Sequence, residues 1–203
     1  MKRYLLLLGG VLLLGAGCSS GIEIAHGGPG EKLLWSSQPE RPTWTIEEPS
    51  KKDKNLLFVG VSDKYSSETD ARKKAFQDAT NKIANYLGSL AQTRYEKAVI
   101  SLGLSSKAAD STIGSRDYYK QISSNLVRRV RPQKWYIEQW RASKGNGWKV
   151  FVLASVPVEE INESFHQAAR KRLQEIERKG SGEESFKKLL EFWKTMAGEE
   201  IIN

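Results

Sequence analysis

Residues 56–90 read LLFVGVSDKYSSETDARKKAFQDATNKIANYLGSL, and this stretch determines the architecture of the chain. It opens with Leu56–Ser62, a run of apolar, aromatic and β-branched residues with charged residues on both sides. Such a run predicts a buried strand. Gly60 lies inside it, which indicates that a neighbouring element approaches the strand's backbone closely at that point.

A long helix is predicted directly after this strand. Residues Ser67 to Asp70 have the pattern of a capping box, in which side chains bond the free backbone N–H groups at a helix start. Apolar residues then recur at steps of four and three: Ala71, Ala75, Ala79, Ile83, Leu87 and Leu90. Because alanine is small, this stripe lets the helix lie close against a sheet. The pattern extends to Ile100, and the Ser/Gly/Ala-rich segment 101–114 predicts a loop.

The next elements are a short helix and a β-hairpin. Residues 116–127 can form the helix, with Ile122 and Leu126 on one face. Residues 133–142 alternate in polarity, residues 143–147 predict a turn, and residues 148–156 predict the returning strand.

Two further helices are predicted after the hairpin. Pro157 ends the returning strand, a charged helix follows, and Gly180-Ser-Gly182 separates it from a final helix. The predicted fold class is therefore α+β: a small antiparallel or mixed sheet built from strand, long helix, short helix and hairpin, with two C-terminal helices.

The N-terminus carries an export signal. Two cations precede a short apolar run, Leu5–Leu14, which is too short to span a bilayer as a helix. Small residues end at Gly17, and Cys18 follows as the chain's one cysteine, which resembles a bacterial lipobox. That resemblance implies cleavage between Gly17 and Cys18, a diacylglyceryl thioether on the sulfur and an acyl group on the new amine. The alternative is an ordinary secretory signal with an incidental cysteine.

Several acyl chains would hold the protein firmly on a membrane, because each buried methylene contributes about 0.8 kcal/mol. Ser19, rather than Asp, follows the cysteine, and in Gram-negative lipoproteins this implies sorting to the outer membrane. Four regions are predicted: 1–17, a lipoprotein signal peptide; 18–41, the lipidated cysteine and a flexible, Gly-rich tether; 42–157, the α+β domain; and 158–203, a C-terminal helical extension. Arg41-Pro-Thr-Trp44 is expected to pin the end of the tether to the domain, because an exposed indole needs a docking place.

Charge is unevenly distributed along the chain. The whole sequence of 203 residues has a formal net charge of +8, and residues 114–150 hold nine Lys/Arg against two Asp/Glu. An exported protein does not meet nucleic acid as its natural partner, so the basic segment points to anionic lipid, cell-wall polymer or an acidic protein face.

The densest basic cluster is Arg128, Arg129 and Arg131. Guanidinium groups could bind phosphate or carboxylate groups there, since their planar fork pairs with two oxygens at once. The alternative is a solvated strand entry whose charges discourage edge-to-edge pairing.

Aromatic residues suggest a second contact surface. Trp135, Tyr136, Trp140 and Trp148 crowd one hairpin, and they form either core or a platform for a partner protein or sugar ring. Trp193 lies on the apolar stripe of the last helix, which either folds back on the sheet or faces another protein or a second copy of the chain. Trp140 and Trp193 complete the predicted contact surface.

Enzymatic chemistry finds little support. His26 and His166 are the only histidines and have no metal-ligand spacing. No Gly-x-Ser-x-Gly motif is present, and helix-dipole complementation explains the Glu159–Glu160 and Glu183–Glu184 pairs. We therefore expect no catalytic residue, no metal and no cofactor, and a protein that is not an enzyme.

Five features occur together: the lipoprotein signal, Arg41-Pro-Thr-Trp44, Phe58–Ser62, the Ala71, Ala75 and Ala79 stripe, and Trp140 with Val150–Leu153 on a hairpin. Over residues 41–157 the chain thereby resembles the LPP-twenty family of bacterial lipoproteins, which includes flagellum-associated outer-membrane lipoproteins. The resemblance implies a compact sheet with helices on it, acting as a structural or binding module.

The sequence thus predicts a non-enzymatic, lipid-anchored protein of the outer membrane, facing the periplasm. Its expected role is to hold or organise envelope components through protein–protein contacts. Its expected partners are the membrane, an envelope protein and a second copy of itself. The alternative function is a lipoprotein regulator that activates a cell-wall (peptidoglycan) synthase.

Overall fold

A computed structural model describes residues 30–47, 49–101, 120, 122, 124–142, 145–179, 184–198 and 202. The predicted signal peptide, Cys18 and the first part of the predicted tether lie outside these residues, as does the predicted loop after Ser101. None of the helices within the described ranges combines the length and apolar character needed to cross a membrane.

The strands form one five-stranded sheet in the order β1-β4-β5-β3-β2. Their bounds are β1 Lys32–Ser36, β2 Ser50–Lys52, β3 Asn55–Val61, β4 Arg131–Ala142 and β5 Gly145–Pro157. Every neighbouring pair is antiparallel. The predicted α+β fold is confirmed, and of the two predicted kinds of sheet the antiparallel one is present.

Three long helices and a 3-10 turn accompany the sheet: α1 Glu68–Ser101, α3 Val158–Lys179, α4 Glu184–Gly198 and η1 Thr43–Ile46. Residues 124–127, the described core of the predicted short helix, are helical. Ile122 and Leu126 are both buried, as the predicted apolar face requires.

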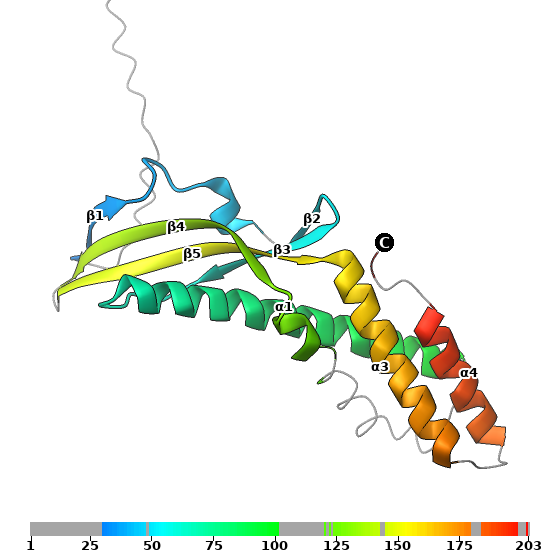
Figure 1. Ribbon diagram of the computed structural model, residues 1–203. Helices are drawn as coiled ribbons and strands as arrows, with labels where there is room; N and C mark the ends of the chain where they lie inside the picture. Colours follow the sequence, from blue (N-terminus) through cyan, green and yellow to red (C-terminus); the bar gives the residue numbers. More distant parts are fainter. Residues whose placement is uncertain are drawn as a thin grey trace, which may run out of the picture.

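Helix α1 runs along one face of the sheet and continues beyond it (Figure 1). Its predicted stripe is buried from Ala71 to Leu87 and packs on apolar residues of β3 and β5. The Asp70 backbone N–H donates to Ser67 Oγ at 3.4 Å, in line with the predicted cap. At Gly60 the backbone of α1 comes so close to β3 that a side chain would not fit between them, which confirms the predicted close approach.

The opposite face of the sheet is covered by the chain that precedes β2. Trp44 in η1 packs on Tyr136, Phe151 and Leu153, so the predicted docking of this indole is confirmed. The predicted extent of the tether is wrong, because Lys32–Ser36 form β1 and pair with the edge of β4. β1 itself reads KLLWS, but it is short and lies between Gly- and Pro-containing segments, and its strand conformation depends on its partner rather than on its own alternation.

The predicted hairpin is longer than expected. β4 begins at Arg131 and contains a register shift between Pro132 and Lys134, while Ala142 pairs with Gly145. Gly145 has φ +114°, which a residue with a side chain rarely adopts. The predicted turn 143–147 is therefore wrong, because its last three residues belong to β5.

The two C-terminal helices form an antiparallel pair at the far end of α1 (Figure 1). Phe192 and Trp193 of α4 contact Tyr95 of α1, with ring centroids 5.2 and 6.1 Å apart. Of the two interpretations of the last helix, the fold-back one is correct, although α4 packs on α1 rather than on the sheet.

Candidate interaction site at the open edge of the sheet

Two of the predicted contact residues are interior residues. Trp140 is 5 % exposed and Trp193 is 2 % exposed. The prediction that they form a contact surface is wrong, because the N-terminal segment covers the face on which Trp140 lies and α4 turns Trp193 toward α1. Tyr136 and Trp140 share this face, as the alternation of side chains along a strand requires, but alternation does not reveal what covers the face.

A buried polar network surrounds Trp140. Its indole N–H donates to Glu138 Oε2 at 2.9 Å, and Arg41 Nε donates to Glu138 Oε1, also at 2.9 Å. Burial raises the pKa of the neighbouring Tyr136 above its ordinary value of 10.0, and the negative charge of Glu138 adds to this effect. These groups satisfy one another and hold the N-terminal segment on the sheet, so the network has a structural role.

The basic cluster lies where predicted, on the surface at the start of β4. Arg129 Nη1 contacts Glu160 of α3 at 3.0 Å, and Arg131 Nη1 donates to the Arg128 carbonyl at 2.9 Å. Within the described part of the chain, Arg128 and Lys134 pair with no carboxylate. Among the described strands, β1 alone pairs with this side of β4, and it does so only from Glu138 onward, so the half of β4 before Glu138 has an open edge. Both interpretations, edge protection and anion contact, fit this position.

A charge reversal separates these two interpretations. We expect Arg128→Glu with Lys134→Glu to lower the yield of envelope proteins cross-linked to the protein about fivefold, the effect of losing ~1 kcal/mol of pairing. Lys73→Glu with Lys74→Glu, an equal charge change on the exposed side of α1, serves as the control. Equal yields from both double variants, at unchanged melting temperature, would leave edge protection as the only role.

A second open edge lies on β3, and sequence reasoning missed it. β2 pairs only with Asn55 to Leu57, so no strand within the described ranges pairs with Phe58 to Val61 on that side. Two side chains of α1 bond the backbone groups that a neighbouring strand would otherwise bond. The Val61 backbone N–H donates to Asp78 Oδ2 at 2.9 Å, and Lys82 Nζ donates to the Val59 carbonyl at 3.0 Å.

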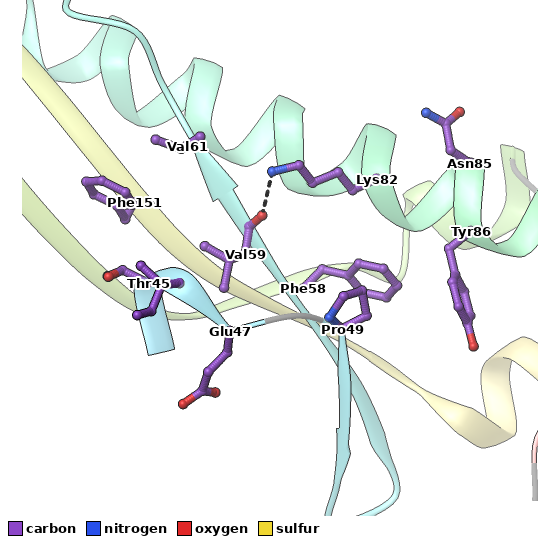
Figure 2. Close-up of a pocket in the computed structure, with 11 residues that line it drawn as sticks. Thr45, Glu47, Pro49, Phe58, Val59, Val61, Lys82, Asn85, Tyr86 and Phe151 are labelled. Atoms are coloured by element: carbon purple, nitrogen blue, oxygen red, sulfur yellow. Dashed lines mark hydrogen bonds between the residues drawn. The ribbon is translucent and has the colours of Figure 1, made fainter. Parts of the chain in front are cut away.

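A groove of about 510 Å³ follows this edge (Figure 2). The Thr45–Glu47 segment and Pro49 line one side, and the α1 residues Lys82, Asn85 and Tyr86 line the other. Two large apolar side chains at its rim face solvent: Ile46 is 79 % exposed and Tyr86 is 40 % exposed. Exposed apolar groups around an open strand edge are typical of a protein-binding site.

One sequence signal could have revealed this groove: Pro49 directly before the short segment Ser50–Lys52, and a turn at Asp53-Lys54 directly after it. In the structure Asp53 and Lys54 both have positive φ, at 49° and 62°, and form the tight turn between β2 and β3. A short lysine-rich strand before such a turn, with Pro49 directly ahead of it, indicates that β2 is too short to cover its partner. The helix side chains that complete the edge, Asp78 and Lys82, have no such signal.

Other chemistry is not assembled in the described ranges. No group of three or more His, Cys, Asp or Glu side chains there is placed to hold a metal ion. His166 lies on α3 at the rim of a second, mixed-charge cleft, and His26 lies outside the described residues. Searches against family models, characterised proteins and solved structures found no match to this chain.

Proposed function

We propose that this protein is a lipid-anchored, non-enzymatic component of the bacterial outer membrane that holds another envelope protein. Cys18 provides the anchor, the residues after it provide reach, and the described domain provides the contact. The resemblance to the LPP-twenty family, through Phe58–Ser62 and the hairpin motif, favours the same role. The periplasm is the side on which the domain would work.

The observation that carries this proposal is the groove beside β3. Ile46 and Tyr86 face solvent on either side of it, although the same fold buries larger apolar residues elsewhere. Fully burying an apolar side chain is worth roughly 1.5–3 kcal/mol, of which most is still available at Ile46 and less than half at Tyr86, whose side chain is 40 % exposed. A partner that covers them recovers this free energy on binding.

Lipidation is tested directly on the protein from the cells that make it. We expect mass spectrometry to find a chain that begins at Cys18 and carries a diacylglyceryl group and an acyl group. Cys18→Ser should release most of the protein from the membrane fraction or leave its signal peptide uncleaved, because the acyl chains supply the membrane affinity. An unmodified sulfur on a freely soluble protein would contradict the proposal.

The identity of the bound protein separates this function from its alternative. A structural envelope protein, recovered by cross-linking in intact cells, supports a holding role. A peptidoglycan synthase whose rate rises when the lipoprotein is added would favour the regulator instead.

A further inference from the structure

We infer that the partner enters the groove as an extended strand, which pairs with the open edge of β3 and lengthens the sheet. This inference rests on the proposed function and specifies how the partner is recognised. Three features support this inference: the direction of the backbone groups at the open edge, the Asp78 and Lys82 side chains that bond to that edge, and the residues that line the groove.

The first support is the direction of the backbone groups. In the β3–β5 ladder, the Ser62 N–H donates to the Val150 carbonyl at 2.9 Å. Because hydrogen bonding alternates along a strand, the backbone groups of even-numbered residues in β3 face β5. The N–H and C=O groups of Val59 and Val61 therefore face away from the sheet, toward the groove.

The second support is the complementarity of charge at this edge. An acid on α1 accepts from the Val61 N–H and a cation on α1 donates to the Val59 carbonyl, so the two side chains supply the acceptor and donor that a paired strand would supply. They also pair with each other at 2.8 Å, and Lys82 is 46 % exposed while Asp78 is 34 % exposed. Exposed pairs of this kind contribute only about 0–1 kcal/mol, so an incoming backbone can displace them.

The third support is the arrangement of the groove's walls. Val59 and Val61 belong to the apolar cluster on the Trp44 side of the sheet, whereas Phe58 belongs to the α1 side, where its ring lies 5.5 Å from that of Tyr86. Successive side chains of a strand point to opposite faces, so an added strand needs apolar contacts on both sides of the edge. Ile46 offers an apolar contact on one side of the edge and Tyr86 offers one on the other. This arrangement suits an extended segment better than a helix.

The occupant is accordingly an extended segment of the partner with apolar residues at alternate positions. The charged side chains that line the groove are Lys82 on α1 and Glu47 on the opposite side, one of each sign. Lys82 is already paired with Asp78. The lining therefore recognises the segment through its backbone and its apolar side chains rather than through a net charge.

Site-specific photo-cross-linking in intact cells tests this inference on the full chain. A photoreactive phenylalanine analogue is placed at position 46, at position 86 or, as the control, at the exposed Leu33, which lies on β1 at the opposite edge of the sheet. We expect one and the same partner to be captured from positions 46 and 86, since an added strand lies between them, and not from position 33.

Two substitutions then report on backbone pairing itself. Val59→Pro removes an N–H that faces the groove and keeps the ladder with β5, as proline is tolerated at strand edges. It should abolish capture from both positions at unchanged far-ultraviolet circular dichroism. Lys82→Met frees the Val59 carbonyl and should raise capture about threefold to fivefold, whereas Lys74→Met, an exposed lysine on the same helix, should not.

Each outcome decides the question. Capture that survives in a folded Val59→Pro variant overturns strand pairing and leaves the proposed function standing. If that variant does not fold, Lys82→Met decides alone, and unchanged or reduced capture overturns the inference. Partners captured only from other surfaces also refute it, while the absence of any partner refutes both it and the proposed function.

Discussion

Gly60→Ala is expected to destabilise the domain by about 3 kcal/mol or more, which exceeds the usual penalty for overpacking a core. A Cβ at this position would lie 2.1 Å from the Ala75 carbonyl oxygen and 2.6 Å from the Ala79 backbone nitrogen. Both are backbone atoms of α1, so no side-chain rotation can relieve the clash. The whole helix would have to move away from the sheet, which would loosen the buried alanine stripe.

The measurement is chemical denaturation of the purified protein, followed by circular dichroism. Gly88→Ala is the matched control, since Gly88 lies in α1 and an added Cβ there meets nothing within 4 Å. That change should stabilise the protein by about 0.5–1 kcal/mol, because alanine favours a helix over glycine. A denaturation midpoint for Gly60→Ala equal to that of the parent would show that α1 does not lie on β3 as described.

Arg41→Ala is expected to have the second largest effect, a loss of about 3–5 kcal/mol in the free energy of unfolding. Arg41 supplies the positive charge for Glu138, whose side chain is 2 % exposed, and its guanidinium carbon lies 4.9 Å from the centre of the Phe151 ring. Without Arg41 the carboxylate remains buried with neutral donors beside it, the Trp140 indole N–H and the Tyr136 hydroxyl. An uncompensated buried charge is costly, because the interior solvates it poorly.

The double variant Arg41→Ala with Glu138→Gln shows whether charge is the cause. A neutral amide can still accept from the indole, so we expect more than half of the lost stability to return. Thermal and denaturant unfolding of the three proteins provide the comparison. A loss below about 1 kcal/mol for Arg41→Ala would place this pair among surface ion pairs, whose contributions are small.

Local patterns predicted the elements well because each of them reports on a nearby partner. The Ala71 to Leu87 stripe indicates that a sheet packs on one side of the helix, and Gly60 indicates that a helix lies close to the strand. Trp44 indicates that the segment containing it docks on the domain. β1 escaped prediction because its strand conformation depends on β4, about a hundred residues away. Its own residues, Lys32–Ser36, show no burial that alternates strongly between two faces.

The candidate site was harder to foresee than the fold. Arg128, Arg129 and Arg131 were found because a cluster of like charges is visible in the sequence itself. The β3 groove depends instead on where a strand stops: its defining feature is the absence of pairing beyond Leu57 among the described strands. Trp140 and Trp193 misled because large aromatic residues serve cores and interfaces equally well, and only tertiary packing separates the two.

The way in which β1 joins the sheet would have a mechanical consequence for a chain anchored, as proposed, at Cys18. A pull on the N-terminus would first break the ion pair of Glu31 with Lys64, and would then break the pairs of β1 with β4 one at a time, starting at Lys32 beside Arg141 near the end of the hairpin. Peeling would stop at the ion pair of Arg41 and the buried Trp44. Each freed residue adds up to roughly 3.5 Å, so residues 31–40 would yield about 30 Å of extension under weak tension while the domain stays folded.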